Sequence, residues 1–209
     1  MGWEILLADD HTIIRRGVRD LIRDRIPGVH QVREVGSCAE LLAELRKQVP
    51  HLLVLDLDMG DGNAIELLDL FRLRHTDMRV LVFSMAPENL YAQRTASLGS
   101  VGYLRKGSTE EEMVQAFRQV LRGECYVSHE EEMRRLDQGE GMAQTGFQGL
   151  SDRELMVMHE LLKGFSVVEI AAKGGLKPNT VTTYKARLFD KLGVKNILEL
   201  QRLVEESKP

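Results

Sequence analysis

The chain has 209 residues, which exceeds one ordinary domain and suits two small ones. Its hydrophobic fraction of 43% and charged fraction of 29% are ordinary for a globular protein and argue against a disordered chain. No apolar run approaches the roughly 18 to 20 residues that a membrane helix needs, and the N-terminus lacks the basic segment of a signal peptide. Two distant cysteines fit no metal or redox spacing, so a cytoplasmic protein without a membrane partner is expected.

The net charge of −4 is divided unevenly along the chain. Residues 150–209 contain 10 Lys and Arg against 8 Asp and Glu, and therefore carry a charge of +2. The preceding residues contain 18 against 24 and carry −6. An acidic N-terminal part and a mildly basic C-terminal part suit a regulatory domain joined to a DNA-binding domain, although this asymmetry is modest.

Residues 1–122 alternate short apolar runs with amphipathic stretches. Nearly continuous apolar strands are what a parallel sheet buried on both faces requires. Five strand–helix units therefore predict an α/β domain with a doubly wound, five-stranded parallel sheet. Ser108 followed by Glu111 predicts a capping box at the start of the last helix. The predicted strands are Ile5–Ala8, Val32–Val35, Leu52–Leu55, Val80–Phe83 and Gly102–Leu104, and the predicted helices are Ile13–Ile22, Ala39–Leu45, Ile65–Leu73, Leu90–Leu98 and Met113–Leu121.

Residues 123–148 lose this regular pattern and have few apolar anchors. An acidic run at Glu130-Glu131-Glu132 is followed by several glycines. This composition predicts a linker, with a helical start around Glu130 to Leu136.

Residues 149–209 have only helical patterns. Ser151 and Glu154 form a second predicted capping box, which opens a helix that reaches Lys163. Pro178 is well placed at the first position of the third helix. These patterns predict a small all-α domain, with its later helices at Val167–Lys173, Pro178–Leu192 and Ile197–Val204.

Polar side chains stand at the ends of four predicted strands in the first domain. Asp9 and Asp10 follow the first strand, Asp56 the third, Ser84 the fourth and Lys106 the fifth. Because ligands gather at the carboxyl ends of parallel strands, these groups should meet at one edge of the sheet. A single Asp after a strand is often only a helix cap, but the joint arrangement favours a reactive site. Crowded carboxylates attract Mg²⁺, and Asp56 would be a nucleophile for phosphoryl transfer, with Lys106 and Ser84 beside it.

Residues 1–122 resemble the receiver domain of bacterial two-component response regulators, which has a flavodoxin-like fold. The resemblance implies that Asp56 accepts a phosphoryl group from a sensor histidine kinase. It also implies that Asp9, Asp10, Asp56 and the backbone carbonyl of Asp58 bind Mg²⁺. The matching segments are Leu7-Ala8-Asp9-Asp10-His11, Val54-Leu55-Asp56-Leu57-Asp58-Met59, Val82-Phe83-Ser84 and Gly102-Tyr103-Leu104-Arg105-Lys106.

The same resemblance assigns the remaining groups of the site. Lys106 would pair with the phosphoryl group, Ser84 would donate a hydrogen bond to it, and Tyr103 would rotate inward as the switch aromatic. Three positions depart from the usual pattern. Gly60 replaces proline, Ala64 replaces a glycine that closes the loop, and Met85 replaces a small residue beside the site. These departures predict a different loop path and restricted access for phosphodonors or water.

Residues 150–204 resemble the LuxR-type helix-turn-helix domain of the NarL/FixJ response regulators. The matching segments are Leu150 to Glu154, Leu161 to Ser166, Glu169-Ile170-Ala171, Asn179-Thr180-Val181 and Lys191 to Val194. In the third helix, Val181, Tyr184, Leu188 and Leu192 fall at helical spacing and should face the core. The opposite face would enter the major groove of double-stranded DNA. The predicted DNA contacts are Asn179, Thr180, Thr182, Thr183, Lys185, Ala186 and Lys191.

The helix-turn-helix also departs from its relatives. Gly174-Gly175 stands where a leucine usually packs, and Lys177 replaces the usual serine N-cap. Lys177 should forfeit about 1 kcal/mol of capping. These changes predict a less rigid DNA-binding unit.

Together the two resemblances imply a transcription factor, not an enzyme, whose phosphorylation on Asp56 controls dimerisation and sequence-specific DNA binding. A homodimer is expected because paired helix-turn-helix units read paired half-sites. Two alternatives stay open. One is a phosphorylation-independent receiver that acts as a protein-interaction module. The other is a phosphatase similar to the haloacid dehalogenases, whose nucleophile loop has the Asp-x-Asp pattern of Asp56 and Asp58.

Overall fold

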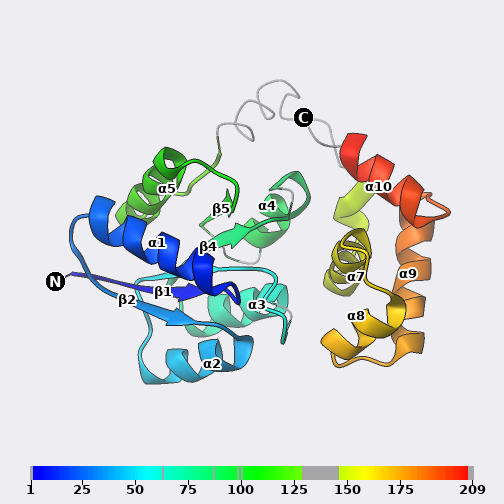
Figure 1. Ribbon diagram of the computed structural model, residues 1–209, viewed down its shortest axis with the longest axis horizontal. Coiled ribbons are helices and arrows are strands. Elements are labelled where there is room, and N and C mark those ends of the chain that lie inside the picture. Colours follow the sequence, from blue (N-terminus) through cyan, green and yellow to red (C-terminus); the bar gives the residue numbers. More distant parts are fainter. Residues whose placement is uncertain are drawn as a thin grey trace. The chain divides into compact units, whose positions relative to one another are not determined.

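A computed structural model of the chain describes residues 2–62, 64–86, 88–97, 99, 101–128 and 146–206 (Figure 1). The chain divides into two compact units, Met1–His129 and Glu130–Pro209. The predicted helical start around Glu130 to Leu136 lies outside the described residues. No helix in the described ranges is both long and apolar enough to cross a bilayer.

The first unit contains a five-stranded parallel sheet in the order β2-β1-β3-β4-β5, which confirms the predicted doubly wound fold. The chain leaves β1 for β2 on one side and later returns to β3 on the other. The strand order therefore reverses between β1 and β3, where such folds bind their ligands. The strands are β1 Trp3–Ala8, β2 Val29–Val35, β3 Leu52–Leu55, β4 Arg79–Ser84 and β5 Gly102–Arg105.

Helices cover both faces of this sheet (Figure 1). Helices α1 and α5 lie on one face, where Ile5, Ile22 and Phe117 belong to a buried apolar cluster. Leu6 and Leu53 alternate with that cluster along their strands and are also fully buried. Burial on both faces explains why the strands read as continuous apolar runs. The helices are α1 Thr12–Arg25, α2 Cys38–Lys47, α3 Ala64–Arg74, α4 Glu88–Ser97 and α5 Glu110–Arg122.

The segment after α5 stays packed on the first unit as far as Ser128. Tyr126 is buried, forms a bridge beside Gly102, and donates its backbone N–H to the carbonyl of Val101 at 2.9 Å. A Cβ on Gly102 would lie 2.9 Å from Cβ of Tyr126, so this close approach requires glycine. Ser128 then donates its hydroxyl to Glu88 at 2.7 Å. The first part of the predicted linker therefore lies against β5 and α4.

Within its described residues 146–206, the second unit consists of helices, as predicted. Val157, Val181, Leu188 and Leu200 are fully buried within it. Its elements are the short 3-10 helix η1 Gly146–Gly149 and the helices α7 Asp152–Leu162, α8 Val167–Lys173, α9 Pro178–Leu192 and α10 Ile197–Glu206.

Capping boxes begin three of the helices, and one of them differs from the prediction. The N-cap of α5 is Thr109, which exchanges hydrogen bonds with Glu112, so the predicted Ser108–Glu111 pair was wrong by one residue. Ser108 instead donates its backbone N–H to the carbonyl of Arg105 in the preceding turn at 3.0 Å. The Ser151–Glu154 box of α7 is confirmed, and Ser166 with Glu169 forms an unpredicted third box at α8.

The two candidate caps of α5 can be separated by mutation. Thr109→Ala removes a side-chain acceptor from the helix N-terminus and should lower the free energy of unfolding by about 1 kcal/mol. Ser108→Ala is the matched control and should change it far less. Urea unfolding followed by circular dichroism measures both values. Equal losses for the two variants would contradict the assignment of Thr109 as the cap.

Candidate functional site

Two buried carboxylates stand side by side at the carboxyl edge of the sheet. Asp9 follows β1 and Asp56 follows the neighbouring strand β3, where the Asp56 N–H donates to the carbonyl of Ala8 at 2.8 Å. Asp9 is 4% exposed and Asp56 is 2% exposed. Two charges buried this deeply are costly unless an opposite charge reaches them.

Lys106 supplies that opposite charge from the end of β5. Its Nζ lies 2.6 Å from Asp9 Oδ2 and 2.8 Å from Asp56 Oδ2. The Lys106 side chain is 3% exposed, and its backbone N–H donates to the carbonyl of Ser84 on β4 at 3.0 Å. The structure thus brings together the acidic and ammonium groups that the sequence placed at separate strand ends.

Burial and charge act in opposite directions on these groups. The pKa of Asp56 is raised from 3.8 to about 6, mainly because the carboxyl is buried and in smaller part because Asp9 is nearby, while Lys106 lowers it. For Lys106, burial lowers the pKa, but the two carboxylates raise it more, so its pKa lies above the ordinary value. Lys106 therefore remains an ammonium at neutral pH. Asp56 retains an unusually high proton affinity for a carboxylate.

The acidic edge fits a hard divalent cation such as Mg²⁺. Ligand atoms from Asp9, Asp10, His11 and Asp56 all lie within 4.8 Å of one another. Asp56 Oδ1 is buried and finds no hydrogen-bond partner within the described part of the chain. A buried carboxylate oxygen without a donor is a position that a cation would satisfy. The predicted ligand at Asp58 is a backbone carbonyl, and its role stays a prediction.

His11 is a member of this cluster that the sequence analysis did not single out as a ligand. Its Nδ1 lies 2.6 Å from Asp10 Oδ1 and 3.3 Å from Asp9 Oδ1, and its backbone N–H donates to Asp9 Oδ1 at 2.8 Å. The available signal was its place directly after the two aspartates, at the N-cap of α1. His11 therefore contacts both Asp9 and Asp10.

Ser84 and Tyr103 lie beneath this edge, on neighbouring strands. Ser84 is buried, and its Oγ accepts the backbone N–H of Ala86 at 3.2 Å. Tyr103 is also buried and donates its hydroxyl to the carbonyl of Ala86 at 2.9 Å. Burial raises the pKa of Tyr103 well above its ordinary value, so the phenol keeps its proton. Tyr103 therefore occupies an inward position, joined to Ser84 through Ala86.

The three departures from the family pattern have distinct settings. Gly60 has a φ of +72°, which proline cannot adopt because its ring holds φ near about −65°. The loop therefore follows a path that the usual proline forbids. Ala64 is fully buried at the start of α3. Met85 is 71% exposed, so restricted access to the site stays a prediction.

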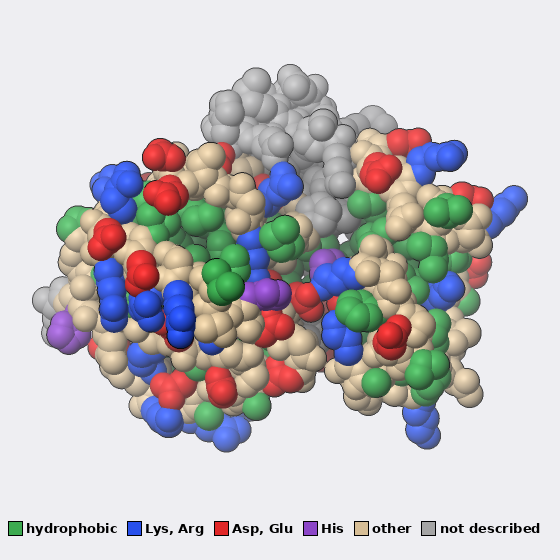
Figure 2. All heavy atoms as spheres, in the orientation of Figure 1, with side chains coloured by type: hydrophobic (Ala, Val, Ile, Leu, Met, Phe, Trp, Pro, Cys, Tyr) green, Lys and Arg blue, Asp and Glu red, His purple; other side chains and the backbone are tan. Residues whose placement is uncertain are grey.

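Helix α9 in the second unit has the two faces that the sequence predicted. Val181 and Leu188 are fully buried, while Tyr184 and Leu192 are partly buried. Four of the predicted DNA contacts are exposed on the opposite face: Asn179, Thr182, Thr183 and Ala186. Lys and Arg side chains are also spread over the visible face of this unit (Figure 2).

Intramolecular contacts distinguish the polar residues of α9. Thr182 and Thr183 donate their hydroxyls to the carbonyls four residues earlier, at 3.1 and 2.9 Å. Lys185 Nζ lies 5.4 Å from the centre of the Phe189 ring. Lys191 Nζ instead donates to the carbonyl of Gly149 at 2.9 Å and to Glu154 at 2.6 Å. Lys191 therefore ties the end of α9 to the start of α7.

The turn before α9 contains both unusual features noted in the sequence. Gly175 has a φ of +61°, a left-handed conformation that favours glycine. Lys177 is the N-cap and makes no side-chain capping bond, as predicted, and Pro178 occupies the first turn.

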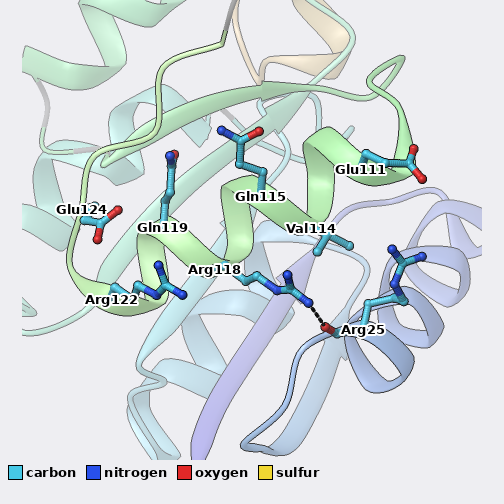
Figure 3. A pocket seen from close by; sticks show the side chains of 8 residues that line it. All are labelled: Arg25, Glu111, Val114, Gln115, Arg118, Gln119, Arg122 and Glu124. Atoms are coloured by element: carbon cyan, nitrogen blue, oxygen red, sulfur yellow. Dashed lines mark hydrogen bonds between the residues drawn. The ribbon is translucent and has the colours of Figure 1, made fainter.

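A surface pocket of about 410 Å³ lies along α5, next to the end of α1 (Figure 3). Arg118 crosses it and donates to the backbone carbonyl of Arg25 at 3.0 Å. The lining includes the charged residues Arg122, Glu111 and Glu124. It contains none of the predicted site residues.

The raised pKa of Asp56 predicts a pH-dependent stability. When a carboxyl has a higher pKa in the folded state than in the unfolded state, the protein loses stability as the pH rises from the unfolded-state pKa to the folded-state pKa. Without Mg²⁺, Asp56→Asn should therefore gain stability over wild type as the pH rises from about 4 to about 6, with a plateau above. The total gain should reach about 3 kcal/mol.

Urea unfolding of wild type and Asp56→Asn across this pH range measures the effect. Asp24→Asn, at an exposed position of α1, is the matched control and should show no such trend. A stability difference that is independent of pH would contradict the raised pKa.

Comparisons with known proteins cover both units. Residues 5–118 match the response regulator receiver domain, and residues 148–204 match the luxR family of bacterial regulatory proteins. The response regulator UvrY of Escherichia coli K12 is 30% identical over 201 residues, which cover 95% of this chain and 92% of UvrY. The response regulator GacA of Pseudomonas aeruginosa is 29% identical over 202 residues, covering 96% of this chain and 94% of GacA.

Solved structures of RcsB from Salmonella are similar along the whole chain. One RcsB structure has a TM-score of 0.78 at 24% identity, and covers 100% of this chain and 99% of that chain. A second, bound to the promoter rprA in the presence of the phosphomimetic BeF3⁻, has a TM-score of 0.72 at 25% identity, with 98% and 99% covered.

Proposed function

Because the chain belongs to the response regulators of the NarL/FixJ family, which join a receiver to a LuxR-type DNA-binding domain, we propose that Asp56 is its phosphoacceptor. One observation carries this proposal. Asp56 is buried at the topological switch point, beside Asp9, with the ammonium of Lys106 on one oxygen and no hydrogen bond from the described residues to the other. The family gives the reaction class, and this geometry supports the choice of residue.

The proposed reaction transfers a phosphoryl group from a phosphohistidine of a sensor histidine kinase. An oxygen of Asp56 attacks phosphorus and forms a P–O bond. The P–N bond breaks at the same time, and the histidine imidazole is the leaving group. Lys106 moves its charge from the two carboxylates to the new phosphoryl oxygens, and the Ser84 hydroxyl donates a hydrogen bond to them. Asp9, Asp10, Asp56 and the Asp58 carbonyl would hold Mg²⁺, which when bound neutralises negative charge on the phosphoryl oxygens.

The same proposal gives Tyr103 a role in the switch. Ser84 accepts the N–H of Ala86, and Tyr103 donates to the carbonyl of Ala86. A hydrogen bond from Ser84 to the phosphoryl group would therefore change the contacts of Ala86, whose carbonyl accepts the hydrogen bond from the Tyr103 hydroxyl. This contact would favour one of two receiver conformations and thereby control dimerisation and DNA binding.

In the DNA-binding domain, α9 is the proposed recognition helix. Thr182 and Thr183 use their hydroxyl donors within the helix, which leaves their methyl groups for thymine. Asn179 supplies an amide for adenine, while Thr180 and Ala186 complete the surface near the bases. Lys185 and Lys191 would bind phosphates, and Lys191 must first release Glu154. The DNA target is double-stranded, and we propose a cytoplasmic homodimer that binds paired half-sites.

Acetyl phosphate with Mg²⁺, followed by intact mass measurement, tests the phosphoacceptor. Wild type should gain about one phosphoryl mass, because Asp56 is the buried nucleophile with an ammonium beside it. Asp56→Ala should gain none, and the exposed Asp24→Ala should behave as wild type. A wild-type chain that binds DNA but never gains the mass would favour the phosphorylation-independent receiver.

A different assay addresses the phosphatase alternative. Turnover of a generic phosphate ester that persists after deletion of residues 150–209, and is lost in Asp56→Asn, would favour that enzyme class over a DNA-binding regulator.

The recognition surface predicts two kinds of DNA-binding defect. With genomic fragments selected by the wild-type chain, Asn179→Ala should weaken binding by about 1–3 kcal/mol and relax specificity at one position. Lys185→Gln should weaken binding to all fragments alike and reduce the salt slope by about one. Fluorescence anisotropy at several salt concentrations measures both effects. Uniform loss of affinity in Asn179→Ala, with specificity intact, would contradict a base contact.

A further inference from the structure

The loop between β3 and α3 is fastened to the first turn of α2 by Asp61. The Asp61 carboxylate accepts the backbone N–H of Cys38 on one oxygen at 2.7 Å, and that of Ala39 on the other at 3.2 Å. These bonds join residues that are more than 20 positions apart in the sequence. Asp61 lies five residues after Asp56, in the same loop as Asp58.

The helix needs this carboxylate because its own cap serves only part of the first turn. The first four N–H groups of a helix have no partner within the helix. In α2, the Ser37 carbonyl accepts the first regular helical bond, from the N–H of Leu41, and the Ser37 hydroxyl accepts the N–H of Glu40. The N–H groups of Cys38 and Ala39, the first two residues of the helix, are accepted by Asp61. Asp61 therefore completes the N-terminus of α2 from outside the helix, and its negative charge suits this end of the helix dipole.

The loop is also held closely on both sides. A Cβ on Gly62 would lie 2.9 Å from Sγ of the buried Cys38, which leaves no space for a side chain there. A Cβ on Gly60 would lie 3.3 Å from Asp10 Oδ2. The backbone of the loop therefore passes between α2 and the acidic edge, and Asp61 fixes its α2 side.

We propose that Asp61 is a positioning residue for phosphoryl acceptance, which anchors the loop containing Asp58 so that its backbone faces the cation site. This inference rests on the proposed function of Asp56 and Mg²⁺. With Gly60 at a φ of +72°, the loop lacks the rigidity that proline gives in relatives. The Asp61 anchor replaces that rigidity by a bond to a neighbouring helix. Asp61 itself touches neither phosphoryl group nor metal.

The anchor can be measured without phosphorylation, through the two cysteines. Burial and the Asp61 carboxylate raise the pKa of Cys38 to about 12, which keeps it a thiol, whereas Cys125 is exposed. Iodoacetamide labelling of the full chain should therefore modify Cys125 first. In Asp61→Asn, which keeps the side-chain shape but loses the charge and one acceptor, Cys38 labelling should accelerate several-fold relative to Cys125.

The functional consequence is tested by Mg²⁺ titration of the same variants. The Mg²⁺ concentration for half-maximal phosphorylation by acetyl phosphate should rise several-fold in Asp61→Asn, and the rate at saturating Mg²⁺ should change much less. The Mg²⁺ concentration for the half-maximal increase in Tm of the unphosphorylated chain should rise in parallel. Asp61→Glu should recover part of the effect, and Asp24→Asn should match wild type.

The outcomes separate the anchor from the proposed function. Faster labelling of Cys38 with unchanged Mg²⁺ dependence would overturn the positioning role and leave Asp61 a helix cap only. Unchanged labelling would overturn the anchor itself. A wild-type chain that takes no phosphoryl group would overturn the proposed function, while the Mg²⁺-dependent Tm of Asp61→Asn would still decide whether Asp61 positions the cation site.

Discussion

The structure of the first unit depends on a single ammonium held between two buried carboxylates. Asp9 and Asp56 are neighbours because β1 and β3 are neighbours, and Lys106 reaches both from the end of β5. Without Lys106, the repulsion of two charges in a poorly solvated edge would oppose folding. The same pair stays reactive because only one Asp56 oxygen is occupied by the ammonium, while the other is buried without a hydrogen bond from the described chain. Stability and reactivity thus come from one arrangement.

Most of this arrangement was predictable from the sequence, because it follows from topology. Apolar runs gave the strands, and the strand-end rule placed Asp9, Asp56 and Lys106 at one edge. Contacts that depend on local backbone geometry were harder to predict. Ser108 and Thr109 both precede a Glu at the spacing of a capping box, and only the backbone conformation selects Thr109. The contact of Asp61 with α2 crosses more than 20 residues, and no periodic pattern marks it.

In the second unit, too, the sequence predicted which residues are buried but not which side chains they contact. Helical periodicity correctly separated the buried face of α9 from its exposed face, because the spacing of Val181 and Leu188 fixes which side meets the core. The spacing does not reveal which basic residues are already engaged. Lys191 reads as a phosphate contact in the sequence, yet it is bound to Glu154, the residue that also completes the cap of α7. The lysine proposed to bind a DNA phosphate is therefore also one that stabilises the domain.

The most direct measurement is a crystal structure of the full chain with Mg²⁺ and beryllofluoride, an analogue of the phosphoryl group. We expect beryllium bonded to Asp56, the metal on Asp9 and Asp10, and Lys106 Nζ moved from the carboxylates to a fluorine atom. Beryllofluoride bound elsewhere, or Lys106 still paired with Asp9 beside an occupied Asp56, would contradict the claim that this ammonium serves first the carboxylates and then the phosphoryl group.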